Sequence, residues 1–136
     1  MILALDPSAL VRRYVRGPGH GLVTEAMADH DTWAAAQLAR PETLVLLADL
    51  AVTPAQRDDL WSAFHADWAR LYSVPTDDAL LAESVEIATG FRIRTIDAIH
   101  LAAAQRLPAP IRYLTFERSQ IAAALELGFD VIAPAE

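Results

Sequence analysis

The sequence predicts an α/β fold in which a central, mostly parallel sheet lies between two layers of helices. Short apolar runs of strand length alternate with longer segments of helical periodicity, and this alternation is typical of parallel sheets covered on both faces. Two of the apolar runs end on an acid: Ile2–Leu5 precedes Asp6, and Tyr113–Phe116 precedes Glu117. Because ligands bind at the carboxyl ends of such strands, the two acids indicate a site at that edge of the sheet.

The first part of the chain is predicted to form two strands and three helices. The strand over residues 32–36 is predicted although its three alanines are poor strand material. Gly17-Pro18-Gly19 breaks the first helix, and Pro41 suits the first turn of the third. The strands cover residues 2–5 and 32–36, and the helices cover residues 8–15, 21–29 and 41–51.

The clearest helical periodicity follows Thr53-Pro54, which caps the next helix. Large apolar residues recur on one face of it, with acids mostly opposite: Leu60, Trp61, Phe64, Trp68 and Leu71. We interpret the tryptophans as core or interface anchors rather than as surfaces on which bases stack. This face offers more large apolar surface than a small domain easily buries alone, which favours self-association.

Three further strands and three further helices complete the prediction. Gly90 is expected to close the first of these helices and Gly128 the last, and Thr95 is expected to cap the helix between them. Pro75 ends the first of the strands. The strands cover residues 71–74, 111–115 and 131–132, and the helices cover residues 77–89, 96–106 and 118–127.

Length and composition are those of one globular domain, residues 1–136. The hydrophobic fraction is 54% and the mean hydropathy is +0.23, values that exclude a disordered chain. No apolar stretch reaches the roughly 18 residues that a membrane helix needs, and no basic segment precedes the first apolar run as in a signal peptide. With no cysteine in the sequence, these features favour a cytoplasmic protein that does not contact membranes.

All eleven basic residues are arginine, and the absence of lysine excludes several functions. Phosphate loops of the Walker type and Schiff-base enzymes need a lysine, as do response-regulator receivers and haloacid-dehalogenase-type phosphatases. The net charge of −7 argues against a broadly basic nucleic-acid binder. It leaves open a nuclease whose cations are metal ions.

A third acid, Asp97, opens the helix over residues 96–106. Two carboxylates about 4 Å apart repel by roughly 4 kcal/mol at an effective dielectric constant near 20. A cluster of acids is therefore tolerated only with protonation or bound cations. Oxygen ligands without cysteine favour Mg²⁺ or Mn²⁺ over zinc.

Each acid also has a purely structural interpretation. Asp6 can cap the helix that follows it. Glu42 and Asp97 lie in first turns, where the helix dipole favours a negative charge, and Glu117 can be surface charge. What favours the functional interpretation is the joint match of these acids to one set of motifs.

Three other side chains near the predicted site are ambiguous. His100 has apolar neighbours, so we interpret it as a hydrogen-bonded structural histidine rather than a metal ligand. Arg94 and Arg118 border the site and could hold phosphates. Solvation or internal ion pairs explain both arginines equally well.

Three segments carry a recognisable set of motifs: Leu-Asp-Pro-Ser-Ala-Leu-Val at 5–11, Arg-Thr-Ile-Asp-Ala-Ile-His-Leu-Ala-Ala-Ala at 94–104, and Leu-Thr-Phe-Glu-Arg at 114–118. Together they resemble the PIN-domain ribonucleases, and in particular the VapC toxins of bacterial type II toxin–antitoxin pairs. The resemblance implies a PIN-like three-layer α/β/α sandwich and a Mg²⁺-dependent endoribonuclease. It also implies a homodimer and an antitoxin that covers the site, with structured RNA such as tRNA as the common substrate.

The same resemblance assigns roles to the acids. Asp6 and Asp97 would hold the metal, while Glu42 and Glu117 would complete the catalytic cluster directly or through water. The family usually has aspartate at the position of Glu117, and Pro41 beside Glu42 is atypical. Ser8 and Thr115 match small hydroxyl residues that flank the acids. Two alternatives stay open: a PIN nuclease of RNA processing that is not a toxin, and a degenerate PIN domain that only binds a partner.

Overall fold

The computed structural model describes residues 1–135, which form five strands, seven α-helices and one short 3₁₀ helix. In chain order these are β1 (Ile2–Leu5), α1 (Pro7–Leu10), η1 (Val11–Arg13), α2 (His20–Ala28), β2 (Trp33–Ala36), α3 (Ala39–Leu50), α4 (Pro54–Trp68), β3 (Tyr72–Val74), α5 (Asp78–Phe91), α6 (Thr95–Gln105), β4 (Ile111–Leu114), α7 (Arg118–Glu126) and β5 (Asp130–Ile132). The predicted strands and helices are all present, although the helix expected over residues 8–15 is divided into α1 and η1. No described helix is long and apolar enough to cross a membrane.

The five strands form one parallel sheet in the order β3-β2-β1-β4-β5. Leu3 of β1 lies opposite Trp33 of β2 on one side and Arg112 of β4 on the other. All strands therefore run the same way, and their carboxyl ends lie along one edge of the sheet. Asp6 follows β1 at that edge, and Thr115 follows β4.

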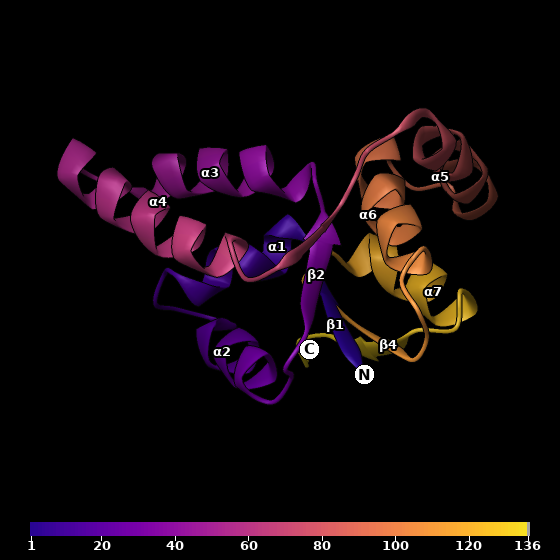
Figure 1. Ribbon diagram of the computed structural model, residues 1–136, viewed down its shortest axis with the longest axis horizontal. Coiled ribbons are helices and arrows are strands. Elements are labelled where there is room, and N and C mark those ends of the chain that lie inside the picture. Colours follow the sequence, from indigo (N-terminus) through magenta and orange to yellow (C-terminus); the bar gives the residue numbers. More distant parts are fainter. Residues whose placement is uncertain (136) are drawn as a thin grey trace.

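Helices cover both faces of the sheet, as predicted, and give three layers (Figure 1). Alternate residues of β1 point to opposite faces. Leu3 and Leu5 pack in a cluster with residues of α1, α2 and α3, whereas Ala4 packs with residues of α5, α6 and α7. The chain thus turns to one face after β1 and to the other face after β4.

The apolar face of α4 is packed within the chain, so the expected large exposed surface there is wrong. Phe64 is 1% exposed and packs with Val11 and Leu47. The indole of Trp61 donates a hydrogen bond to the Leu44 carbonyl over 2.9 Å. These aromatic residues are core anchors because η1 and α3 lie over them. The exposed apolar side chains of this region lie on α3 and the following turn instead, at Val45, Leu46, Leu50 and Val52.

Two predicted helix ends are also wrong. Gly90 lies inside α5, and the left-handed residue that ends the helix is Arg92, with φ of 56°. The extra turn lets Phe91 and Ile93 both pack against the core. Thr95 lies inside α6 and Arg94 is the cap residue, without a capping side-chain bond, because a guanidinium has no acceptor; it donates to Asp97 in the first turn instead.

Candidate active site

Asp6 lies buried at the carboxyl end of β1, 1% exposed, with donors around both of its oxygens. Oδ1 accepts hydrogen bonds from the Ser8 hydroxyl at 2.7 Å and the Ala9 backbone N–H at 3.1 Å. Oδ2 accepts from the Thr115 hydroxyl at 3.0 Å and the Gln120 amide at 3.1 Å. The bond from Ala9 makes Asp6 the N-cap of α1, so its structural interpretation is correct. Two of the other donors, Thr115 and Gln120, come from the loop after β4 and from α7, which a cap does not require.

The hydroxyls of Ser8 and Thr115 join the loops that follow β1 and β4. Ser8 Oγ accepts a hydrogen bond from the Phe116 N–H at 2.9 Å, while Thr115 Oγ1 accepts from the Glu117 N–H at 3.0 Å. Each hydroxyl therefore donates to Asp6 and accepts from the β4 loop. The chain leaves these adjacent strands toward opposite faces, and such a switch point is where parallel sheets bind ligands.

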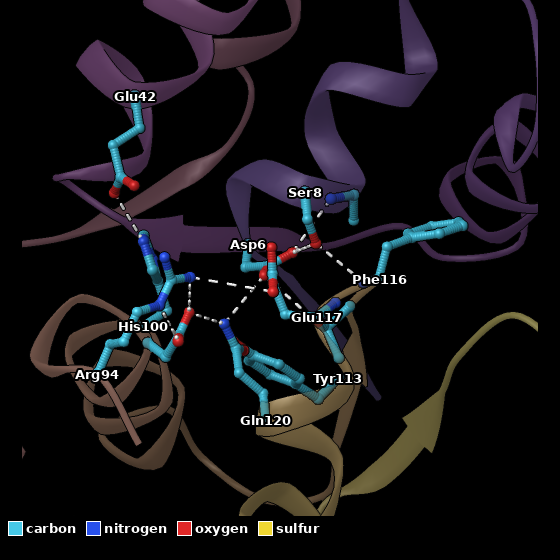
Figure 2. A network of polar contacts seen from close by, with 12 residues as sticks. Asp6, Ser8, Glu42, Arg94, His100, Tyr113, Phe116, Glu117 and Gln120 are labelled. Carbon is cyan, nitrogen blue, oxygen red and sulfur yellow. Dashed lines mark hydrogen bonds and ion pairs between the residues drawn. The ribbon is translucent and has the colours of Figure 1, made fainter. Parts of the chain in front are cut away.

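Asp97 lies in the first turn of α6 and is 2% exposed. Its carboxylate lies near that of Asp6, at the same edge of the sheet. Arg94 binds it with two nitrogens: Nε donates to Oδ2 at 2.9 Å and Nη2 donates to Oδ1 at 3.2 Å. The amide of Gln120 also donates to Oδ1, at 2.9 Å. Since the same nitrogen donates to Asp6, Gln120 bridges the two aspartates that the sequence predicted to lie together. Figure 2 shows its contact with Asp6.

Glu42 and His100 form a second contact across the site. The Glu42 carboxylate lies 2.7 Å from Nε2 of His100, and a carboxylate accepts, so Nε2 carries the hydrogen. His100 is buried on α6 and Glu42 is on α3, so the bond joins the two helical layers above the sheet edge. His100 is hydrogen-bonded, as predicted, and its partner is a candidate catalytic acid.

Glu117 lies at the rim rather than beside the buried pair. Its side chain is 45% exposed and its Oε2 is 3.9 Å from Nη2 of Arg94. Arg94, 67% exposed, thus forms ion pairs with both Asp97 and Glu117. The structure places Arg94 in internal ion pairs, one of the three interpretations that the sequence left open.

Burial sets the electrostatics of the pair. Loss of solvent raises the pKa of the Asp6 carboxyl above its ordinary value, and the Ser8 hydrogen bond only partly offsets this. The pKa of Arg94 is also raised, mainly by its hydrogen bond to Asp97. An additional cation at this position would favour the ionised form of Asp6.

The carboxylate oxygens of this site suit a hard divalent cation that takes its remaining ligands from water and substrate. Asp6, Asp97, Glu42 and Glu117 line one cavity of about 200 Å³. Within residues 1–135 no three His, Asp or Glu side chains are grouped closely enough to hold a metal alone. Mg²⁺ does not need such a cage, because it is commonly held by one or two carboxylates together with water and substrate phosphates. Asp6 and Asp97 are the two that would supply protein oxygens.

Gln120 is the site residue that the sequence analysis missed. It is 1% exposed, and it shares its helix face with the buried Ala123 and Ala124, three and four positions later. Glutamine is seldom buried without a polar partner. Its place on an apolar face was the signal that could have identified it.

The sheet order, the helices on both faces and the buried aspartates at the switch point together are those of a PIN-like domain. No family model matches the chain. Ribonuclease VapC46 of Mycobacterium tuberculosis is 34% identical over 134 residues, which cover 96% of this chain and 95% of the relative. The chain belongs to the VapC family of PIN-domain toxins.

Solved structures show the same fold at lower identity. A toxin–antitoxin complex from Klebsiella pneumoniae contains a chain with a TM-score of 0.72 and 15% identity, covering 98% of both chains. In VapBC2 from Rickettsia felis, solved with a DNA fragment from its promoter, the matching chain has a TM-score of 0.69 and 14% identity. That match covers 99% of this chain and 100% of the other. The predicted PIN-like α/β/α fold is confirmed.

Proposed function

We propose that this protein is a Mg²⁺- or Mn²⁺-dependent endoribonuclease and the toxin of a toxin–antitoxin pair. The observation that carries the proposal is the pair of buried carboxylates, Asp6 and Asp97, held together at the carboxyl edge of the sheet by segments distant in sequence. The name of the Mycobacterium tuberculosis relative supports ribonuclease activity, and the titles of the similar structures support an antitoxin partner. We place the activity in the cytoplasm, where RNA and such a partner would be available.

Asp6 and Asp97 would hold the divalent ion, which would polarise a phosphodiester and lower the pKa of an attacking water. The protein arranges its own groups for this chemistry beforehand. Four donors hold the Asp6 carboxylate in one orientation. Glu42, oriented by His100, and Glu117 lie on the wall of the same cavity, where they can accept hydrogen bonds from water.

Arg94 is the residue placed to meet the RNA backbone. It lies on the cavity wall with most of its side chain in solvent, paired to Asp97 and near Glu117. A chain with a net charge of −7 repels a polyanion, so a cation at the point of contact is needed. A guanidinium can exchange a carboxylate for a phosphate with the same two-pronged geometry.

An intact carboxylate pair argues against the degenerate binding module. Burying two ionisable acids side by side costs free energy unless a cation or donors compensate. A module that only bound a partner would gain nothing from keeping the buried pair open to a cavity. We therefore favour the nuclease over the binding module.

The test is expression of the protein in bacterial cells, with growth and RNA integrity followed together. The wild type should arrest growth and leave cut RNA, and Asp97→Asn should do neither. Asp49→Asn, which changes an exposed acid on α3, is the matched control and should behave as the wild type. Co-expression of a cognate antitoxin should relieve the arrest. Arrest by Asp97→Asn equal to that of the wild type would contradict the proposal.

A further inference from the structure

Gln120 is hydrogen-bonded at both ends of its amide in the buried centre of the site. Its Nε2 donates to Oδ2 of Asp6 at 3.1 Å and to Oδ1 of Asp97 at 2.9 Å. Its Oε1 accepts a hydrogen bond from the Tyr113 hydroxyl at 2.6 Å. The two N–H hydrogens thus meet two carboxylates and the carbonyl oxygen meets a hydroxyl. Every polar atom of the side chain has a partner.

Tyr113 determines which way the amide points. Its side chain is buried and its ring stacks on Phe129, with 5.7 Å between the ring centroids. Burial raises the pKa of its hydroxyl well above the ordinary value, so the hydroxyl keeps its hydrogen and donates it to Gln120. The reversed amide would place Oε1 against two carboxylates and the NH₂ group against a hydroxyl, an arrangement that repels at one end.

Gln120 and Arg94 hold Asp97 in different ways. Arg94 is charged and mostly exposed, so an arriving cation would repel it into solvent. Gln120 is neutral, so a cation would not repel it into solvent. It is also buried beneath the two aspartates, so it has no room to move away. When the cavity side of the pair receives a cation, Gln120 keeps its two hydrogen bonds.

We propose that Gln120 is a positioning residue that sets the spacing of Asp6 and Asp97 for a divalent ion, with Tyr113 orienting its amide. This inference rests on the metal site of the proposed function. An oxygen of each carboxylate is held against one nitrogen, so the separation of these oxygens cannot exceed the two hydrogen bonds laid end to end. Partners that hydrogen-bond metal ligands in this way typically contribute about 10–100-fold to metal affinity.

The experiment measures Mn²⁺ affinity by calorimetry on the full chain, with the melting temperature recorded without metal. Gln120→Met keeps the length of the side chain and removes both donors, and Mn²⁺ binding should weaken by about 10–100-fold. Tyr113→Phe removes only the orienting hydroxyl and should give a smaller loss in the same direction. Gln105→Met, the same change at an exposed position of α6, should leave the affinity unchanged.

The outcomes separate a positioning role from a merely structural one. If Gln120 only stabilised the core, Gln120→Met would lower the melting temperature but leave the Mn²⁺ affinity of the folded protein at the wild-type value, which would overturn the inference. Should Gln120→Met fail to fold, wild-type affinity in Tyr113→Phe would overturn it equally. Wild-type protein that binds no Mn²⁺ would overturn both the inference and the metal site. Weaker binding by the variants alongside normal binding by the wild type supports both.

Discussion

Arg94 and Gln120 bind the same carboxylate, that of Asp97, but only Arg94 can leave it without opening the core. The Arg94 side chain is 67% exposed and pairs with a carboxylate that is almost fully buried. An exposed partner of this kind is held weakly because water competes for it. We therefore expect the Arg94–Asp97 pair to act as a temporary counter-ion contact that a metal ion and an RNA phosphate would replace.

Arg94→Gln should separate metal binding from RNA binding. Loss of the guanidinium removes a competitor for Asp97, so Mn²⁺ affinity should rise, while loss of a phosphate contact should raise KM for RNA more than it lowers kcat. Calorimetry and steady-state cleavage measure the two effects. Arg16→Gln, a change of an exposed arginine outside the acidic cavity, is the control. Mn²⁺ affinity and KM both at wild-type values would contradict this role for Arg94.

At the scale of elements, helix ends decide which side chains reach the site. Asp6 begins α1 and Asp97 lies in the first turn of α6, so both carboxylates lie where the helix dipole favours negative charge. The only non-glycine residue with positive φ among residues 1–135 is Arg92, at the end of the helix before α6. Its left-handed conformation turns the chain so that Arg94 and Asp97 come to the carboxyl edge.

The double change Gly90→Ala and Arg92→Gly should stabilise the protein. Glycine inside a helix costs about 0.5–1 kcal/mol relative to alanine, and the space around the position of a Gly90 Cβ is open. A non-glycine residue in the left-handed region costs roughly 1–2 kcal/mol. The melting temperature should rise by a few degrees with cleavage retained. A lower melting temperature would mean that the Arg92 side chain contributes more than its backbone costs.

The sequence predicted the strands and most of the helices, because their apolar patterns reflect burial directly. It also identified Asp6 and Asp97, since acids after a strand and at a helix start stand out from apolar neighbours. It did not predict Gln120, because the role of an amide on an apolar helix face becomes visible only when the fold brings its hydrogen-bond partners to it. The ends at Gly90 and Thr95 were misjudged for a related reason: packing of Ile93 and the Arg94–Asp97 pair outweighed local preference.

At the scale of the whole molecule, two helices each carry a group of exposed apolar side chains. Val45, Leu46 and Leu50 of α3 are exposed, as are Leu81 and Val85 of α5. The aromatic residues of α4 no longer argue for self-association, since they are packed inside the chain. The family resemblance and these two surfaces are what still support a homodimer and an antitoxin interface.

We predict a homodimer at micromolar concentration, measured by sedimentation equilibrium. Val45→Asp and Val85→Asp each place a charge on one of the two exposed surfaces, and the variant that becomes monomeric identifies the dimer face. Val131→Asp is unsuitable as a control because Val131 packs against the core. Wild-type protein that sediments as a monomer over the whole concentration range would contradict the prediction.

Asp97→Asn is the cleanest variant for the central claim that a cation held by the aspartates cuts RNA. Asparagine at position 6 would place an amide NH₂ group against four hydrogen-bond donors. At position 97 the asparagine oxygen can face Gln120, and its NH₂ group displaces only the exposed Arg94. The most direct measurement is single-turnover cleavage of RNA by wild type and Asp97→Asn in Mg²⁺, in EDTA, and after Mn²⁺ is restored, with circular dichroism confirming the fold. The account predicts cleavage by the wild type in Mg²⁺, none in EDTA, recovery with Mn²⁺, and none by Asp97→Asn in any condition. Cleavage that persists in EDTA, or that Asp97→Asn carries out at the wild-type rate, would contradict it.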